Sequence, residues 1–481
     1  MTVRVRFAPS PTGYLHVGGG RTALYNYLFA KAMGGTYILR VEDTDEVRST
    51  REFEQLQIAD LKWLGIEHTE GPDVGGPYGP YRQSERKHIY TEHAEKLLNQ
   101  NKAYHCFCTE AELEAKKEIA LQANLSPHYD GKCRSVSLEE AKKRLQAGEK
   151  AVIRFRTPMK TYHLHDHVRG EVSFPEDMVG DFVIIRSEGL PVFNFVNAVD
   201  DMLMKITHVI RAEEHLSNTV RQLMIYEAFA AKPPEYAHIS LLTGKDRQKL
   251  SKRHGATSVN QYREDTYLPQ AMVNYLCQLG WSHPEEKDIF TMQEIEKVFS
   301  IDRFNKSPAI FDVEKLNWMN GQHLRQLPMD LLIKEVSAAM PAEHEFHKQN
   351  DVWKNDCLTL FKEQIQFFKE LPNALNVLFD DSFEKSDELT DIFSWETTPK
   401  LAEYLLTAVS GVTTPFITTA QFDEWSNHIK NELKIKGKPL FMGMRAVLTG
   451  HGHGPDLKVI LPLTPIGILK NRVHQIVGAM K

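Results

Sequence analysis

The first residues with chemical potential form a glycine-containing loop close to the start of the 481-residue sequence. Residues 8–19 read APSPTGYLHVGG, so His16 stands shortly before a run of glycines. Glycines let anionic oxygens approach backbone amides, and a helix that starts after them offers free N–H groups to a phosphate. Alone, this pattern is weak evidence for a triphosphate site, because a tight structural turn produces the same residues.

A second candidate is the basic run KLSKR at residues 249–253. Lysines in a mobile loop can neutralise the negative charge that shifts during displacement at phosphorus. A solvated basic loop is the commoner origin of such a run. The two motifs in this order and at this separation are far more specific than either motif alone.

Together the motifs resemble the signatures of class I aminoacyl-tRNA synthetases, HVGG at residues 16–19 and KLSKR at residues 249–253. Gly19 stands where many class I enzymes have a second histidine and where the glutamate-specific branch commonly has glycine or threonine. Further stretches are similar to the bacterial-type glutamyl-tRNA synthetase family: VEDTD at 41–45, EGPDVGGPYGPYRQSER at 70–86, HVIRAEEH at 208–215, RHGA at 253–256, FDVEKLNW at 311–318, KGKPLFM at 436–442 and HGPDL at 453–457. The sequence diverges most between residues 325 and 430.

The resemblance implies an ATP-dependent ligase that joins L-glutamate to the 3′ end of tRNA(Glu) through a glutamyl-adenylate, with Mg²⁺. The α-carboxylate of glutamate would attack the α-phosphorus of ATP, and the 2′-hydroxyl of the terminal adenosine would then attack the adenylate. It also implies that tRNA must be bound before the adenylate forms efficiently. The implied catalytic residues are His16, Lys249 and Lys252, and the implied ATP contacts are His16, Gly18, Gly19, Glu213 and Lys252. Whether tRNA(Gln) is also charged stays open.

Recognition of glutamate requires cations for two carboxylates and an anion for one ammonium. By resemblance, Arg6 and Arg211 face the carboxylates and Glu42 faces the ammonium; the planar fork of arginine suits a carboxylate. Which arginine meets which carboxylate stays open, and a purely structural role at strand ends is the alternative for both. The remaining implied contacts are Ala8, Ser10, Phe193 and Asn197. Phe193 replaces a tyrosine that is frequent in the family, so one substrate hydrogen bond is in doubt.

Cysteines gather in the middle of the first half of the chain. Some relatives bind zinc here, and the resemblance implies a ligand set of Cys106, Cys108, Tyr129 and Cys133, with Ser135 where some relatives have histidine. Three thiolates and a phenol would make a tetrahedral site, although tyrosine is an unusual ligand. Three ordinary buried cysteines are the equal alternative. The alternating His163, His165 and His167 are typical of one face of a strand. We expect them to be surface residues, with an RNA-facing role as an option and a metal-binding role as the less favoured alternative.

The elements that must position these residues follow from periodicity. Residues 3–8 and 37–41 favour strands, and glycines 18–20 lead into a helical pattern between them, which makes a βαβ unit with ligands at the carboxyl ends of the strands. Further strands are predicted at 151–156, 181–186, 207–211 and 236–241. Helices are predicted from Ser84, from Ser137 with Glu140 as a capping box, from Ser217, and from Thr291 with Glu294 as a second box. Beyond residue 268 helical patterns dominate.

We therefore expect a Rossmann-type α/β class I catalytic domain with an inserted acceptor-binding domain, followed by a largely α-helical stem-contact and anticodon-binding region. The expected divisions are residues 1–85 and 196–245 for the catalytic domain, 86–195 for the inserted acceptor-stem domain, 246–325 for the stem-contact domain, and 326–380 and 381–481 for two helical anticodon-binding domains.

Composition excludes several classes of protein. A formal net charge of −6 argues against nucleic-acid binding by bulk charge, although a local basic face on an acidic body remains compatible with it. Five cysteines do not make a disulfide scaffold, and the first residues lack an apolar signal segment, so we expect a cytoplasmic protein. The family suggests a monomer.

Three rival interpretations fit less well. A glutamyl-queuosine enzyme lacks the helical carboxyl-terminal region, and a glutaminyl-tRNA synthetase ends in β-barrels rather than helices. A non-catalytic tRNA-binding paralogue would be expected to lose His16 or Lys252, and both are present.

Overall fold

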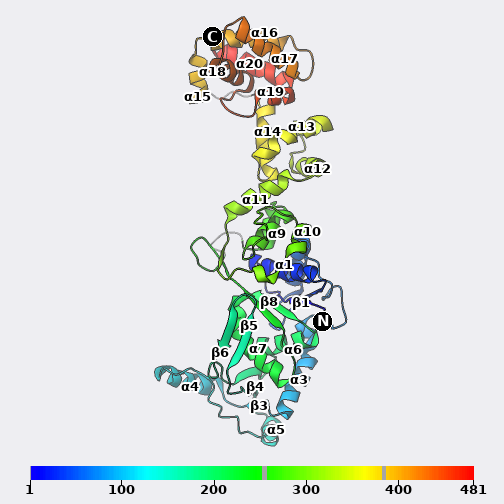
Figure 1. Ribbon diagram of the computed structural model, residues 1–481, viewed down its shortest axis with the longest axis vertical. Coiled ribbons are helices and arrows are strands. Elements are labelled where there is room, and N and C mark those ends of the chain that lie inside the picture. Colours follow the sequence, from blue (N-terminus) through cyan, green and yellow to red (C-terminus); the bar gives the residue numbers. More distant parts are fainter. Residues whose placement is uncertain (1, 252–256, 382–385, 481) are drawn as a thin grey trace. The chain divides into compact units, whose positions relative to one another are not determined.

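The computed structural model describes residues 2–251, 257–381 and 386–480 (Figure 1). Contacts divide the chain into two compact units, Met1–Leu316 and Asn317–Lys481, and each is described by itself. The finer boundaries expected from the sequence stay predictions. No helix among the described residues is long and apolar enough to cross a membrane.

A largely parallel sheet organises the first unit (Figure 1). The strand β1 pairs in parallel with β2, and β8 pairs in parallel with β9 in a sheet of order β6-β5-β9-β8. The amide of Thr207 donates to the carbonyl of Arg4 at 2.9 Å, which places β1 beside β8. The strands are β1 (Arg4–Phe7), β2 (Thr36–Leu39), β5 (Tyr162–Asp166), β6 (Gly170–Phe174), β8 (His208–Ala212) and β9 (Glu235–Ile239). The expected Rossmann-type βαβ core is therefore present.

The helix α1 (Val17–Ala32) joins β1 to β2 and is buried on most faces, because all residues from Ala23 to Ala30 are buried. The sequence placed its start after the glycines, but the helix begins at Val17, so the glycines form its first turn. The reason is the His16 side chain, which accepts from the Gly18 amide and caps the helix early.

The inserted region contributes a three-stranded antiparallel sheet of order β3-β4-β7. Its elements are α3 (Lys87–Asn99), β3 (Ala103–Cys106), α4 (Glu110–Gln122), α5 (Leu138–Gln146), β4 (Val152–Phe155) and β7 (Phe182–Ile185). The hairpin of β5 and β6 also lies within residues 86–195, yet β5 joins the catalytic sheet through β9. On β5, His163 and His165 are exposed as expected, whereas His167 follows the strand and is half-buried.

The remaining elements of the first unit surround the sheets. They are α2 (Arg51–Trp63), α6 (Phe193–Leu203), α7 (Leu216–Ala228), β10 (Leu242–Thr243), α8 (Val259–Glu264), α9 (Pro269–Gln278), α10 (Met292–Val298) and β11 (Ala309–Ile310), while α11 (Val313–Arg325) spans the division. The Thr291–Glu294 capping box forms in full, and Ser137 accepts from the Glu140 amide. The predicted cap at Ser217 is wrong, because α7 already begins at Leu216, after His215.

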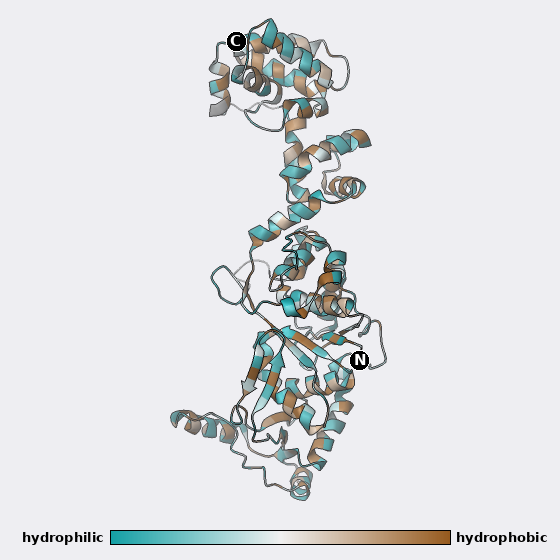
Figure 2. Cartoon of the chain, viewed as in Figure 1, coloured by the Kyte–Doolittle hydropathy of each residue, from teal (hydrophilic) through white to brown (hydrophobic). Residues whose placement is uncertain are grey.

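The described residues of the second unit contain helices and no strand. They form α12 (Met329–Ala339), α13 (Asp351–Phe361), α14 (Leu371–Phe379), α15 (Asp387–Ser394), α16 (Thr398–Ser410), α17 (Thr419–Asn431), α18 (Lys438–Thr449), α19 (Leu457–Ile460) and α20 (Ile466–Met480). Figure 2 shows the mixed hydrophobic and hydrophilic colouring of these helices. Their apolar residues, such as Leu405, Val447 and Val473, are fully buried where α16, α18 and α20 pack together. This excludes the β-barrel ending of a glutaminyl-tRNA synthetase for the part of the unit that is described.

Candidate active site

A cavity of about 490 Å³ opens where β1 and β8 end and α1 begins. It is lined by all seven residues implied for glutamate binding, Arg6, Ala8, Ser10, Glu42, Phe193, Asn197 and Arg211, and by His16, Gly18, Gly19 and Lys249. Parallel sheets bind ligands at the carboxyl ends of their strands, and this cavity lies there. The fold thus brings residues from distant parts of the sequence to one place.

His16 presents a hydrogen-bond donor at the helix start. Its Nδ1 accepts from the Gly18 amide at 3.1 Å, so the proton of the neutral ring lies on Nε2. Burial, followed by the positive charge of Lys249, lowers the pKa of His16, so the ring is neutral near pH 7. A neutral ring at the amino end of α1 can donate to an anionic oxygen without a counter-charge of its own.

The segment after the second motif pairs with the segment that carries His16. The amide of Val17 donates to the carbonyl of Thr257 at 2.9 Å, and the amide of Val259 donates to the carbonyl of Leu15 at 2.8 Å. Backbone hydrogen bonds therefore fix the segment at 257–259, which follows the second motif, to the segment that carries His16, more than 200 residues away in sequence. Lys252 itself lies outside the described residues.

Lys249 and Glu213 have partners of their own. The ammonium of Lys249 lies 2.5 Å from the carboxylate of Glu214. Glu213 does not line the cavity, because its carboxylate accepts from the Leu241 amide at 2.9 Å and lies 2.6 Å from Arg169. Its implied contact with ATP stays a prediction.

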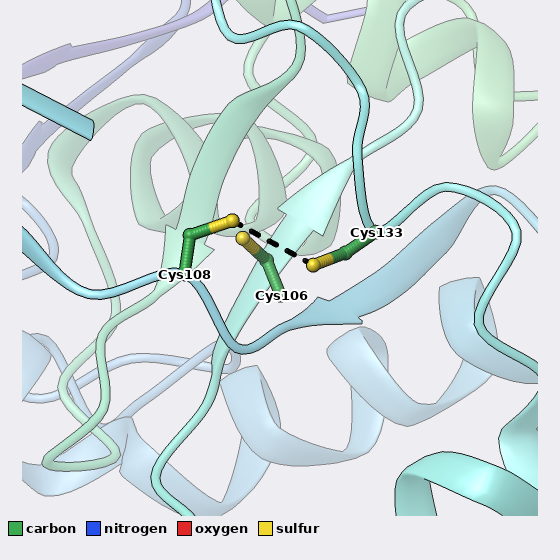
Figure 3. A group of neighbouring side chains, drawn as sticks. All are labelled: Cys106, Cys108 and Cys133. Atoms are coloured by element: carbon green, nitrogen blue, oxygen red, sulfur yellow. Dashed lines mark hydrogen bonds between the residues drawn. The ribbon is translucent and has the colours of Figure 1, made fainter. Parts of the chain in front are cut away.

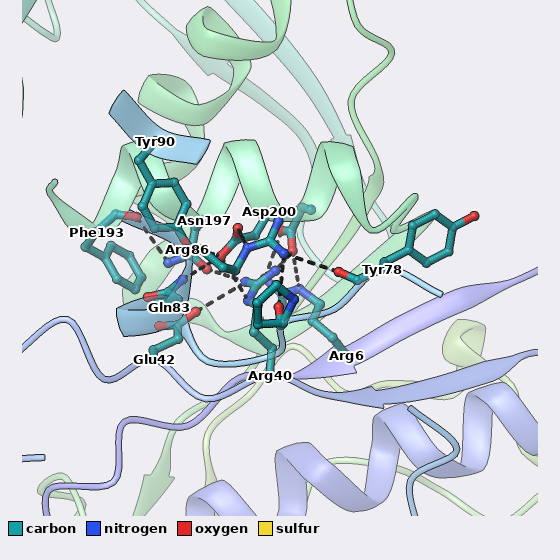
Figure 4. A network of polar contacts seen from close by, with 12 residues as sticks. Arg6, Arg40, Glu42, Tyr78, Gln83, Arg86, Tyr90, Phe193, Asn197 and Asp200 are labelled. Atoms are coloured by element: carbon teal, nitrogen blue, oxygen red, sulfur yellow. Dashed lines mark hydrogen bonds and ion pairs between the residues drawn. The ribbon is translucent and has the colours of Figure 1, made fainter. Parts of the chain in front are cut away.

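A buried network of arginines and carboxylates forms one wall (Figure 4). Asp201 binds Arg6 through both carboxylate oxygens, at 3.0 and 3.1 Å, and also lies 2.5 Å from Arg40. Arg40 further donates to Asn197 at 2.7 Å and lies 3.3 Å from Glu42. The charge of Arg6 is thus shared with a carboxylate before any substrate arrives.

A deeper layer holds this network. Asp200 accepts from Arg86 at 2.7 Å, from Tyr90 at 2.8 Å and from Gln83 at 3.0 Å. The sequence analysis missed Arg40 and this acidic pair. The available signal was two adjacent aspartates, Asp200 and Asp201, in a mostly apolar helical stretch.

Arg211 differs from Arg6 because its partners are uncharged. Its Nε donates to His238 at 3.1 Å and its Nη2 donates to Thr219 at 2.9 Å. Among the residues that the structure describes, no carboxylate forms an ion pair with Arg211, and burial lowers its pKa to about 10. A buried guanidinium without a counter-ion is a strong attractor for a carboxylate.

The acceptor on His238 is fixed by a further buried group. Asp166 lies 2.6 Å from Nδ1 of His238, which places the ring proton there and leaves Nε2 free to accept from Arg211. Both side chains are fully buried. A chain of hydrogen bonds thus runs from the Asp166 carboxylate through the His238 imidazole to the Arg211 guanidinium. The sequence did not predict this chain, because Asp166 and His238 lie 72 residues apart and belong to no motif.

In the network around Arg6 and Arg211, the guanidinium groups outnumber the carboxylates by one, and the cavity lining adds Arg21, Lys249 and Glu214. The guanidinium groups are those of Arg6, Arg40, Arg86 and Arg211, and the carboxylates are those of Glu42, Asp200 and Asp201. His215 adds no charge, because burial and the neighbouring Arg211 lower its pKa to about 4. Burial raises the pKa of Glu42, and the positive charges of Arg40 and Arg6 oppose this. The excess of guanidinium groups in this network favours an anionic ligand.

Phe193 lines the cavity and, unlike a tyrosine at this position, has no hydroxyl group to offer a substrate. Its ring stacks on that of His215, with centroids 5.6 Å apart, and its carbonyl accepts from Asn197 at 3.1 Å. The side chain is partly exposed. The hydrogen bond that tyrosine would give in relatives has no counterpart at this position.

The cysteine group converges as expected (Figure 3). The sulfurs of Cys108 and Cys133 lie 3.7 Å apart, and the Tyr129 oxygen lies 3.4 Å from the sulfur of Cys106 and 3.5 Å from that of Cys108. Zinc–sulfur bonds of about 2.3 Å would separate two sulfurs by about 3.8 Å in a tetrahedron. The donor set therefore fits zinc in spacing and in chemistry.

Comparison with known proteins places the fold and site in a class. A family model for tRNA synthetases class I (E and Q), catalytic domain, matches residues 2–318, and an anticodon binding domain model matches residues 328–475. The architecture is that of a class I tRNA synthetase, as the sequence predicted.

Individual relatives narrow the class. The chain is 46% identical to a glutamate–tRNA ligase of Bdellovibrio bacteriovorus, over 98% of this chain and 97% of the relative, and 43% identical to that of Desulforamulus reducens, over 96% and 97%. A crystal structure of a glutamate tRNA ligase from Elizabethkingia meningosepticum in complex with its amino acid aligns over 100% of both chains, with a TM-score of 0.91 and 33% identity. The chain belongs to the glutamate–tRNA ligase family. This confirms the predicted family, fold class and enzyme class.

Proposed function

We propose that the cavity described above is where this chain joins L-glutamate to the adenylyl group of ATP, before glutamate passes to the 3′ end of tRNA(Glu). The observation that carries the proposal is Arg211, a buried cation without a charged partner among the described residues. Glutamate brings a side-chain carboxylate, which a guanidinium group can bind through two hydrogen bonds.

The placement of glutamate follows from these charges. Glutamine differs from glutamate in lacking the side-chain charge, so the group that distinguishes them must be an uncompensated cation. Arg211 meets this requirement, whereas Arg6 is neutralised by Asp201. We assign the side-chain carboxylate to Arg211, and the α-amino acid end to Arg6 and Glu42.

ATP, as its magnesium complex, would place its phosphates at the start of α1. The free amides of the first turn and Nε2–H of His16 then donate to phosphate oxygens. Lys249 lines the cavity, and Lys252, by its place in the motif, would neutralise charge on the leaving pyrophosphate. These groups stabilise charge as it moves, so no covalent intermediate on the enzyme is required.

Aminoacylation of purified tRNA(Glu) and tRNA(Gln) with glutamate tests the proposal. We expect ATP-dependent glutamylation of tRNA(Glu), which Arg211→Ala reduces. Glutamylation of tRNA(Gln) at a similar rate would identify the alternative, a non-discriminating enzyme. A folded protein that charges neither tRNA would contradict the proposal.

We also propose one structural zinc ion at Cys106, Cys108, Tyr129 and Cys133, supported by the spacing of these atoms. Zinc would cross-link two segments of the inserted region, residues 106–108 and 129–133. Elemental analysis of untagged protein should give about one tightly held zinc per chain, and Cys133→Ser should lose it. Cys277→Ala, a buried cysteine elsewhere, is the control and should retain it. Metal-free protein that is fully folded would count against the site.

A cytoplasmic location and a monomeric state complete the proposal, because tRNA charging occurs where translation does and the site is built from one chain. Gel filtration with light scattering tests the second point.

A further inference from the structure

We propose that His167, His208 and Glu235 form a second metal site, which binds a divalent transition metal ion such as Zn²⁺. The two imidazole Nε2 atoms and a carboxylate oxygen of Glu235 all lie within 4.8 Å of one another. Imidazole and carboxylate together are ligands that suit Zn²⁺, Ni²⁺ and Cu²⁺. The group shares no residue with the cysteine cluster or with the lining of the cavity.

The topology places the three side chains at one edge of the catalytic sheet. His208 begins β8 and Glu235 begins β9, and the two are direct partners in the parallel register. His167 follows β5, and its amide donates to the carbonyl of Tyr236 at 2.9 Å. This is the amino-terminal edge of β8 and β9, whereas Arg211 and Ala212 line the cavity from the carboxyl end of β8. The site is therefore distinct from the active site.

The distances fit a shared ion. Oε2 of Glu235 lies 2.9 Å from Nε2 of His167 and 3.5 Å from Nε2 of His208. Zinc bonds of about 2.0–2.1 Å to nitrogen and oxygen would hold tetrahedral ligand atoms about 3.4 Å apart. Small side-chain rotations would bring both pairs to that spacing.

The tautomer of His208 strengthens the case. The hydroxyl of Thr207 accepts from the Arg4 amide at 2.8 Å and donates to the Arg4 carbonyl at 3.1 Å. With its single proton directed at the Arg4 carbonyl, this hydroxyl accepts from Nδ1 of His208, 2.9 Å away. The lone pair of a neutral His208 then lies on Nε2 and faces the carboxylate of Glu235. A cation between the two removes this repulsion.

The ligands are held in place yet remain reachable from solvent. The ring of His208 packs edge-on against Phe29, with centroids 4.9 Å apart, and its Nδ1–H···Thr207 bond is the kind of outer contact that orients metal-binding histidines. The side chains of His208 and His167 are 17% and 22% exposed, and that of Glu235 is 55% exposed. Three protein ligands leave a fourth position for water.

The chain offers a matched control close by. His165 and Glu171 form a histidine–carboxylate pair at 2.6 Å on β5 and β6, but among the described residues no second histidine joins it in a metal-binding group. Substitution there removes one histidine and one surface ion pair but none of the three proposed ligands; the ring of His165 packs edge-on against that of His167, with centroids 6.0 Å apart.

Calorimetric titration of the untagged full chain with Zn²⁺ tests the inference. The protein as purified should take up one equivalent of Zn²⁺ that His167→Gln and His208→Gln each lose, while His165→Gln retains it. Co²⁺ in this site should give visible ligand-field bands without the thiolate charge-transfer band of a cysteine site, which keeps the two sites distinguishable. Circular dichroism checks that each variant is folded. Equal uptake by wild type and both variants, or loss of uptake in His165→Gln as well, would overturn the proposal.

Discussion

At the scale of single residues, the site separates two arginines that the sequence could not tell apart. Arg6 shares Asp201 with Arg40, whereas Arg211 donates only to His238 and Thr219 among the described residues. The same side chain therefore has two roles. One arginine organises the pocket, and the other supplies the charge that a substrate must neutralise.

Substitution of Arg211 should reduce the preference for glutamate over glutamine. Arg211→Ala leaves the substrate carboxylate buried without a partner, which costs about 2–5 kcal/mol, or roughly thirty- to several-thousandfold in kcat/KM. Arg6→Ala should weaken both amino acids alike, since Arg40 still holds Asp201. Steady-state kinetics with both amino acids on folded variants measures this. The assignment fails if Arg6→Ala is the variant that narrows the preference, or if neither kcat/KM falls about tenfold.

His238 should act as a positioning residue for Arg211. His238→Ala removes the acceptor for a buried guanidinium and should lower kcat/KM for glutamate by about tenfold or more, since such a loss costs about 1–3 kcal/mol. His238→Gln supplies an amide oxygen as acceptor and should recover part of the lost kcat/KM for glutamate. The KM for ATP should stay unchanged in both variants. Equal losses for alanine and glutamine would indicate a packing role instead.

At the scale of elements, backbone pairing and a buried carboxylate hold α8 in place beside the start of α1 and against α2. Thr257 and Val259 pair with the residues around His16, and Val259 is also the first residue of α8. Asp60 of α2 is fully buried, with one carboxylate oxygen 3.4 Å from Arg263 of α8. Neither carboxylate oxygen of Asp60 has a hydrogen-bond partner within the described ranges, and burial raises its pKa to about 6.

This raised pKa predicts a pH-dependent effect of Asp60→Asn. A carboxyl whose pKa is higher in the folded state stabilises the fold at low pH, and that contribution is lost as pH rises through about 6. The asparagine variant does not titrate. It should therefore exceed the wild type in stability by about 1–3 kcal/mol at pH 8 and by about half as much at pH 5. Thermal unfolding at both pH values tests this, and an equal difference at the two pH values would refute it.

At the scale of the whole molecule, an acidic chain must bind an acidic partner. The net charge is −6, so contact with tRNA depends on local basic surface rather than on total charge. Substrate recognition, by contrast, takes place among buried charges that salt screens only weakly. The two kinds of binding should respond differently to ionic strength.

Affinity for tRNA should fall steeply with salt. If about four phosphates are contacted, the Kd should rise on the order of a hundredfold between about 50 and 200 mM salt. The KM for ATP at saturating tRNA should change much less. Filter binding and aminoacylation kinetics measure both, and a tRNA affinity that does not vary with salt would contradict this account.

Local sequence features determined more of this protein than its composition did. The glycines after His16 and the strand periodicity of residues 3–8 and 37–41 predicted the βαβ unit, and the family resemblance of the motifs implied eleven of the twenty-one residues that line the cavity. Helical periodicity predicted the second unit. These features are local, so they can be recognised in the sequence without knowledge of the fold.

Only the tertiary structure decided which charges cancel. The pairing of Arg6 with Asp201, the isolation of Arg211, and the Asp166–His238 support join residues that are far apart in sequence and carry no motif. The structure also showed that α1 begins at Val17, before the glycines rather than after them, because the capping contact of His16 is visible only in three dimensions. The gathering of His167, His208 and Glu235 has the same origin. Burial and proximity give these groups their properties, and both arise from the packing of strands rather than from the order of residues.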